Sequence, residues 1–180
     1  MERPILLDVS RLLWRSWEGR LPTGIDRTCI AYVQHLRGRA RAVAQRAGGT
    51  LVLGKSASHR LFDLLCDPPD DIRRQLGKLV PAALSGRDIP TLDRSILLNV
   101  GHTGLDQPGH ARWVQKSGVR AVYFVHDLIP ITHPEYCREG EAQRHAQRMR
   151  AILKLGRGIV TNSARSLADC AAFAADEQLP

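Results

Sequence analysis

The feature that most limits the fold is the regular alternation of short apolar runs and helical stretches in the second half of the chain. Buried strands are predicted at 96–100, 119–125 and 158–161, where apolar residues follow one another for the length of a strand. Helical spacing is found at 111–116, 135–155 and 164–173. Strands joined by helices predict a parallel sheet, because a parallel pair needs a long crossover connection.

The first half of the chain begins in the same way and then becomes less regular. The near-continuous apolar run at 5–9 predicts a first strand that is covered on both faces. A loop with Trp14 and Trp17 follows, and then a helix at 25–36 with Thr23 as its cap. This half is completed by short apolar runs at 42–44 and 51–53 and a helix at 70–79. The fold class is therefore α/β, a doubly wound, mainly parallel Rossmann-like sheet with helices on both faces.

Length and composition fit one domain of a cytoplasmic protein. The chain has 180 residues, 43% of them hydrophobic, which is enough for a single domain spanning 1–180. No apolar run approaches the roughly 20 residues of a membrane span, and the start has no signal-peptide core. The four cysteines form no C-x-x-C pair, so we expect free thiols. The net charge of +8 suits an anionic partner.

Polar residues follow four of the predicted strands, at the edge where open α/β sheets bind their ligands. They are Asp8 and Ser10, then Asn99, Gly101 and His102, then His126 and Asp127, and finally Asn162 and Ser163. Because the carboxyl ends of parallel strands share one edge, we expect these side chains to line a common site.

His126 and Asp127 are the candidate catalytic residues at this edge. An imidazole titrates near neutral pH and a carboxylate can fix its tautomer, so the pair could orient a substrate hydroxyl or polarise a reacting group. The alternative is structural. In that case His126 would satisfy loop carbonyls, and Asp127 would shape a turn with the nearby prolines.

Gly24 and Arg27 are a second candidate pair, at the start of the helix at 25–36. Backbone amides at a helix start attract phosphate, and Gly24 would let a ligand approach closely. Arg27 would add a positive charge, although it could instead pair with Asp26 or Asp8.

His102, Asn162 and Ser163 are candidate sugar contacts, each with a structural alternative. His102 belongs to a glycine-containing loop suited to contacting a sugar, but a solvent-exposed histidine would look the same in sequence. Ser163 is placed to cap the last helix.

The helix at 135–155 is rich in basic residues. They form either a solvated face or a contact with a membrane surface, which makes a peripheral position at the inner membrane an alternative location. The residues are Arg144, Arg148, Arg150 and Lys154.

A resemblance to the amino-terminal domain of family-4-type glycosyltransferases rests on VHDLIP at 125–130, THPEY at 132–136 and TNS at 161–163. LPTGIDR at 21–27 is similar to the glycine loop that follows the first strand in that family. These enzymes are retaining and have the GT-B fold, and many of them build bacterial capsules and exopolysaccharides. The resemblance implies that this chain is the amino-terminal half of a GT-B fold.

The resemblance implies a two-domain enzyme that transfers a hexose from a sugar nucleotide to a growing surface polysaccharide or a lipid-linked acceptor. The amino half would hold the acceptor and the carboxyl half the donor. By position, Gly24 and Arg27 would contact the donor diphosphate, His126 would bond the sugar, and Asp127 would hold the loop or the imidazole. The paired glutamates of the family's carboxyl domain have no counterpart, so we expect an incomplete half that needs a carboxyl-domain partner.

Other classes lack their motifs. The chain has no G-x-G-x-x-G after its first strand and no G-x-S-x-G elbow. It has no Asp-x-Asp motif either, and the resemblance implies transfer with no metal and no cofactor besides the sugar-nucleotide substrate. A non-catalytic basic module that binds nucleic acid or a partner subunit remains the alternative. We expect no nucleic-acid partner, because the arginines are dispersed and few aromatic residues are available for stacking.

Overall fold

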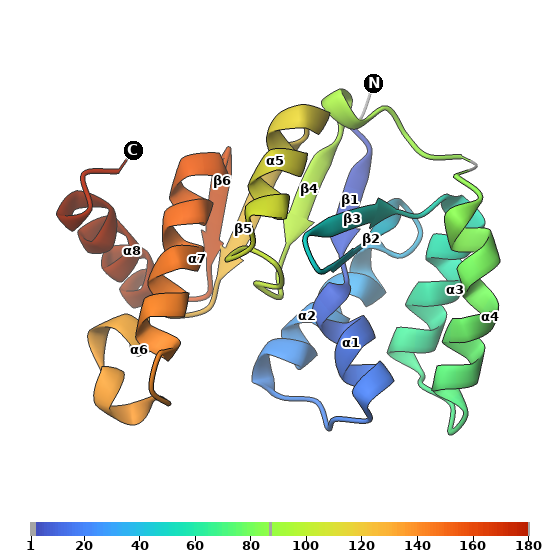
Figure 1. Ribbon diagram of the computed structural model, residues 1–180, viewed down its shortest axis with the longest axis horizontal. Coiled ribbons are helices and arrows are strands. Elements are labelled where there is room, and N and C mark those ends of the chain that lie inside the picture. Colours follow the sequence, from blue (N-terminus) through green and yellow to red (C-terminus); the bar gives the residue numbers. More distant parts are fainter. Residues whose placement is uncertain (1–2, 87, 180) are drawn as a thin grey trace.

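The computed structural model describes residues 3–86 and 88–179, and Met1, Glu2, Arg87 and Pro180 lie outside the described residues. The chain forms one six-stranded sheet with helices on both sides (Figure 1). The strand order is β3-β2-β1-β4-β5-β6. This mostly parallel, Rossmann-like sheet confirms the predicted fold class.

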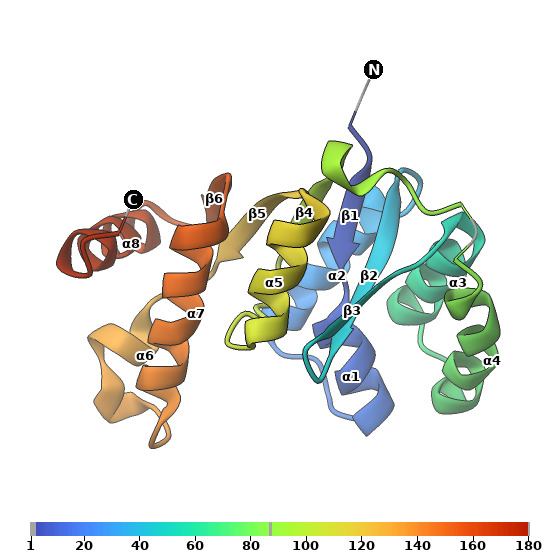
Figure 2. The same cartoon turned by 45° about the horizontal axis from the view of Figure 1, so that its top comes forward.

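The sheet is parallel except at one edge, where β3 runs antiparallel to β2. The central strand β1 pairs with β2 and β4, and its last residue, Asp8, lies opposite Asn99 of β4. The carboxyl ends of the parallel strands point toward α1 and α6 (Figure 2). The strands are β1 (Ile5–Asp8), β2 (Ala40–Arg46), β3 (Gly49–Val52), β4 (Ile96–Asn99), β5 (Arg120–Val125) and β6 (Gly158–Thr161).

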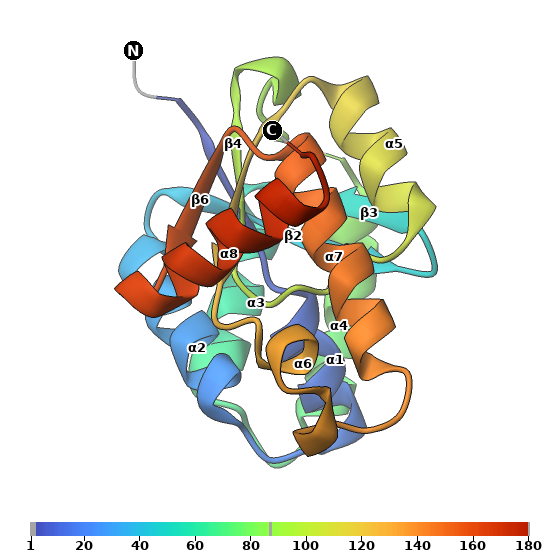
Figure 3. The same cartoon turned by 90° about the vertical axis from the view of Figure 1, so that its left-hand side faces the viewer.

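Helices cover both faces of the sheet, as doubly wound topology requires. Figure 3 shows the sheet from its edge, with α2 on one side and α5 and α7 on the other. The helices are α1 (Ser10–Glu18), α2 (Gly24–Leu36), α3 (Lys55–Cys66), α4 (Ile72–Leu84), α5 (Pro108–Ser117), α6 (Ile129–Thr132), α7 (Glu141–Leu155) and α8 (Ala164–Asp176), with short 3-10 turns η1 (Leu92–Arg94) and η2 (Pro134–Tyr136).

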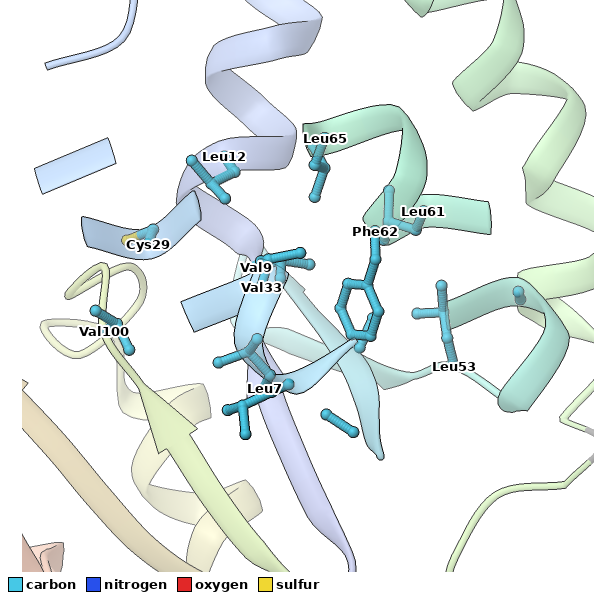
Figure 4. Close-up of a cluster of buried hydrophobic side chains, with 14 of the residues drawn as sticks. Leu7, Val9, Leu12, Cys29, Val33, Leu53, Leu61, Phe62, Leu65 and Val100 are labelled. Atoms are coloured by element: carbon cyan, nitrogen blue, oxygen red, sulfur yellow. The ribbon is translucent and has the colours of Figure 1, made fainter. Parts of the chain in front are cut away.

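Each face of the sheet has its own hydrophobic core, because neighbouring side chains of a strand point to opposite faces. In β1, Leu7 belongs to the core beneath α2, α3 and α4, and Leu6 belongs to the core beneath α5, α7 and α8. Figure 4 shows the first of these cores, where Phe62 of α3 packs beside Leu7 and Val33.

The β2–β3 hairpin turns through two residues, Ala47 and Gly48, both of which have positive φ. Such a turn matches the right-handed twist of the two strands. It presses on the first turn of α5, where a Cβ added at Gly109 would lie 2.0 Å from the carbonyl oxygen of Gly48. Two glycines therefore allow the hairpin and α5 to touch through their backbones.

The structure corrects the predicted loop after the first strand, since α1 begins at Ser10 directly after β1. Leu12 is buried on the helix face that meets the first core, and Trp14 is half-buried. The helical spacing of these apolar side chains is short, and Pro22 and two glycines nearby favoured a loop in the sequence.

Three further helices differ from prediction. The helix predicted at 70–79 is α4, which runs from Ile72 to Leu84. The helix α3 was missed, although Leu61, Phe62 and Leu65 are buried along one face of it. The helix α7 begins at Glu141, not at 135, because Pro134 starts a separate turn and Gly140 has a φ of 78° that interrupts the helix.

The predicted free thiols are confirmed, with Cys29 and Cys170 buried and Cys66 and Cys137 partly buried. Within residues 3–86 and 88–179, no helix has the length and apolar character needed to cross a membrane.

Candidate functional site

A polar pocket of about 730 Å³ lies at the carboxyl ends of β1, β4 and β5. Its volume falls within the range of small-molecule sites, roughly 300 to 1,000 Å³. Its walls come from α1, the β2–β3 turn, the loops after β4 and β5, and α7. The lining includes Arg11, Trp14, Ile25, Gln45, Arg46, Gly101, His102, Asp106, His126, Asp127, Glu141, His145 and Arg148.

The floor beside this pocket is built on the buried carboxylate of Asp8. Asp8 accepts hydrogen bonds from the backbone N–H of Ser10 at 2.9 Å, from Nδ2 of Asn99 at 3.1 Å and from Nε2 of Gln45. Burial raises the pKa of Asp8, and these hydrogen bonds partly offset the shift. Asp8 thus joins β1 to β2 and β4 by hydrogen bonds at the strand ends, and it also accepts a hydrogen bond from the first residue of α1.

The same chain of hydrogen bonds continues from Gln45 through His110 to Tyr123. Nδ1 of His110 lies 3.0 Å from Oε1 of Gln45, and Nε2 lies 2.8 Å from the Tyr123 hydroxyl. Burial lowers the pKa of His110 to about 4, so its ring is neutral at neutral pH. Because Oε1 can only accept, Nδ1 donates to it and Nε2 accepts from Tyr123. Every donor in the chain therefore points toward Asp8.

Three histidine rings meet on the β5 side of the pocket. The ring of His102 lies 5.4 Å from that of His126 and 5.9 Å from that of His145, centroid to centroid. Burial lowers the pKa of His102 to about 3 and also lowers the pKa of His145. Nε2 of each ring donates to a backbone carbonyl. His102 donates to Phe124 at 2.5 Å, His126 donates to Val100 at 2.8 Å, and His145 donates to Asp127 at 3.1 Å.

These bonds fix the orientation of His126 and leave one nitrogen for a ligand. A carbonyl oxygen only accepts, so Nε2 of His126 carries the hydrogen, and Nδ1 is the nitrogen that can accept a hydrogen bond from a ligand. The backbone carbonyl of His126 in turn accepts from the hydroxyl of Ser166, at 2.9 Å. The structural role predicted as an alternative for His126 is thus present, together with its place in the pocket wall.

Asp127 holds its own loop. Its Oδ1 accepts from the backbone N–H of Ile129 at 3.1 Å, which fits the predicted turn with Pro130. Among the described residues, no hydrogen bond joins Asp127 to the ring of His126, so the geometry favours the loop role over the imidazole role.

The three arginines of the pocket differ in how their charge is matched. Nε of Arg11 lies 2.7 Å from Asp26, and Nη1 of Arg148 lies 3.0 Å from Glu141. Arg46 instead stacks over the Trp14 ring at 4.4 Å, and within the described part of the chain it forms no ion pair. Arg46 is therefore the pocket cation with an unmatched charge.

At the start of α2 a capping box between Thr23 and Asp26 uses two of the backbone amides. Thr23 donates its backbone N–H to Asp26 at 2.6 Å, and Arg11 and Arg15 pair with the same carboxylate at 2.7 and 2.9 Å. Burial alone would raise the pKa of Asp26, but the bonds from Thr23 and the charge of Arg11 outweigh it and lower the pKa. The carboxylate of Asp26 thus caps the start of α2 and balances the charges of the two arginines.

Gly24 and Arg27 do not line the polar pocket. Ile25, the neighbour of Gly24, lines the same pocket as His126, and space around Gly24 is open, with nothing within 4 Å of an added Cβ. The side chain of Arg27 is exposed and outside the lining. The predicted pairing of Arg27 with Asp26 or Asp8 is wrong, because other groups hold both carboxylates.

The remaining candidates divide in the same way. His102 is buried in the pocket wall, so the alternative of a solvent-exposed histidine is wrong. Asn162 and Ser163 are exposed and outside the lining. The Ser163 hydroxyl accepts from the backbone N–H of Ser166 at 3.0 Å, which is the helix cap predicted as its alternative role.

The basic residues of α7 do not form one face. Arg148 points to the pocket, Arg144 lies 3.7 Å from Glu141, and Arg150 pairs with Glu177 at 2.6 Å. Lys154 is exposed.

Sequence reasoning missed Trp14, Gln45, His110 and His145. Gln45 could have been noticed as the uncharged polar residue that directly follows the apolar run at 42–44. His145 could have been noticed as the histidine of α7 that shares a helix face with Met149 and Ile152. Trp14 and His110 gave no comparable signal, because their role depends on contacts across the sheet.

In the part of the chain that the structure describes, no three His, Cys, Asp or Glu side chains are grouped as metal ligands. Comparisons with protein-family models, with curated proteins and with solved structures found no match for this chain. Its function is therefore argued from the pocket and from the residues described above.

Proposed function

We propose that this chain is the acceptor-side half of a glycosyltransferase that moves a hexose from a sugar nucleotide to a growing bacterial surface polysaccharide or a lipid-linked acceptor. One observation carries the proposal. His126 and Asp127, the centre of the motif that resembles family-4-type glycosyltransferases, line the polar pocket at the strand ends together with His102.

The lining of the pocket suits a saccharide. Sugar hydroxyls both donate and accept, and the pocket offers carboxylate acceptors at Asp127 and Glu141 beside the amide of Gln45. Trp14 adds a flat apolar ring, which suits the carbon face of a sugar. The neutral ring of His102 adds a polar group without adding charge. The proposal thus accounts for a pocket that is polar yet holds few unmatched charges.

In this proposal His126 contacts the sugar near the reacting carbon. Its ring is already oriented by the bond to the Val100 carbonyl, so no ordering of the ring is needed when a ligand binds. A departing phosphate develops negative charge, which cations and backbone amides stabilise. Arg46 is the cation of the pocket that is free for this role, whereas Arg27 and Gly24 do not line the pocket.

The test is saccharide binding by the chain and by matched histidine variants. We expect a hexose or disaccharide to protect the pocket in NMR titrations, and we expect His126→Ala to weaken that binding by at least about tenfold, one lost bond to a polar group. The control is His133→Ala, since His133 belongs to the same motif but is exposed and lies outside the pocket. His126 is buried and bonded to the Val100 carbonyl, so His126→Ala should also lower the midpoint of unfolding, and binding is compared where both variants are fully folded.

The proposed contact with the donor diphosphate is tested by a separate substitution at Gly24. Gly24→Ala meets open space, so it should leave stability unchanged and weaken binding of uridine or guanosine diphosphate only if the diphosphate approaches this glycine. Absence of saccharide binding, or a folded His126→Ala variant that binds saccharide as tightly as the unsubstituted chain, would contradict the proposal. Salt-dependent retention of nucleic acid would instead favour the basic binding module.

A further inference from the structure

A second cavity, of about 420 Å³, adjoins the polar pocket and is almost wholly apolar. We call it the apolar cavity. It lies between α1, α4 and the β2–β3 hairpin, and Trp14 and Arg46 line both cavities. Its other lining residues include Leu13, Trp17, Ala44, Leu51, Leu61, Leu76, Leu79, Val80, Ala83 and Leu84.

Large apolar side chains at this cavity remain in contact with water. Trp17 is 41% exposed, Val80 is 50% exposed and Leu84 is 67% exposed. Their grouping around one cavity distinguishes them from apolar residues scattered singly over a surface. A ligand that covers them gains free energy in proportion to the apolar area it removes from water.

The boundary between the two cavities is rigid and positively charged. The indole N–H of Trp14 donates to the backbone carbonyl of Gln45 at 2.7 Å, which fixes the ring, and Arg46 stacks on that ring. Since the described residues supply no ion pair to Arg46, an anionic group of a ligand can match its charge. The order along the surface is therefore polar pocket, cation, apolar cavity.

We propose that the apolar cavity binds the alkyl chain of an amphiphilic ligand whose anionic group lies at Arg46 and whose polar head occupies the polar pocket. That the head is a saccharide rests on the proposed function. The chain and the anionic group rest on the apolar cavity and Arg46. For the transferase, this makes the acceptor a saccharide joined to a lipid chain through an acidic group.

The test titrates the full chain with alkyl phosphates of increasing length, from ethyl to octyl, by calorimetry. Each methylene that leaves water should tighten binding by about fourfold, so octyl phosphate should bind at least about tenfold more tightly than butyl phosphate. In the double variant Val80→Glu/Leu84→Glu, this dependence on chain length should be lost. Arg46→Gln should weaken every alkyl phosphate by a similar factor and keep the dependence on length.

The matched control is Leu167→Glu, which places the same charge at an exposed apolar position of α8, away from the cavity. Affinity that does not rise with chain length, or that rises equally in Val80→Glu/Leu84→Glu, overturns the proposal. So does a doubling of the molecular mass in light scattering that the double variant abolishes, because a second copy would then cover this face. Alkyl phosphates contain no sugar, so their binding can succeed when saccharide binding fails, and the reverse.

Discussion

The two cavities share a wall at Trp14 but are built in opposite ways. In the polar pocket, side chains such as Gln45 and His126 are bonded to the protein before any ligand arrives. In the apolar cavity, Leu79, Val80 and Leu84 offer apolar surface that forms no directional hydrogen bonds. The polar pocket can therefore select a ligand by the positions of its hydroxyl groups, whereas the apolar cavity can select only by length and bulk.

The largest expected effect tests whether the polar floor is also part of the fold. Asp8→Ala removes the acceptor of three buried donors, and we expect the free energy of unfolding to fall by roughly 3 kcal/mol, as measured by urea denaturation. Asp8→Asn, which keeps one acceptor oxygen, should lose about half as much. At the apolar cavity, Leu84→Ser should cost less than about 0.5 kcal/mol, since Leu84 is largely exposed. Equal losses at Asp8 and Leu84 would remove the contrast between the cavities.

Acid should destabilise the protein through the buried histidines near the polar pocket. Burial lowers the pKa of His102 to about 3 and of His110 to about 4, whereas their ordinary value is 6.5. As the pH falls below about 6.5 the unfolded chain binds protons that the native chain does not, so stability falls by about 1.4 kcal/mol per pH unit for each histidine. Asp8 opposes this change near its own titration, because a raised native pKa makes the native state the better proton binder there.

The measurement is the urea midpoint across this acid range. His110→Gln should reduce the dependence of stability on pH by the contribution of one histidine. Leu84→Ser should leave this pH dependence unchanged. A midpoint that stays constant or rises as the pH falls toward about 4 would show that these rings are protonated in the native state.

The smallest effect concerns the shared wall. Trp14→Phe keeps an aromatic ring but removes the N–H that bonds to Gln45, so we expect a loss of about 1 kcal/mol in unfolding free energy. Trp17→Phe is the matched control at the exposed side of the apolar cavity and should cost less than about 0.5 kcal/mol. Similar losses in the two variants would mean that the indole bond does not support the wall.

The parallel core was predictable because β1, β4 and β5 are apolar over most of their length, and the edge of the sheet where polar residues collect followed from that topology. The region between 36 and 96 was harder, since α3 gave no clear signal in sequence. Among site residues, His102, His126 and Asp127 line the pocket. Arg27 does not, because its position on α2 turns it to solvent, and helical spacing alone did not reveal which side faces the sheet.

The contact between Gly48 and Gly109 determines which part of the pocket wall can adapt to a different ligand. The hairpin turn forms part of the pocket wall and packs on α5 backbone to backbone, so the turn cannot move back to enlarge the pocket. Adaptation to a bulkier ligand must therefore come from the opposite side, where the loop after β5 leads through α6 into α7. That loop can vary in length and sequence while the hairpin stays as a fixed reference surface.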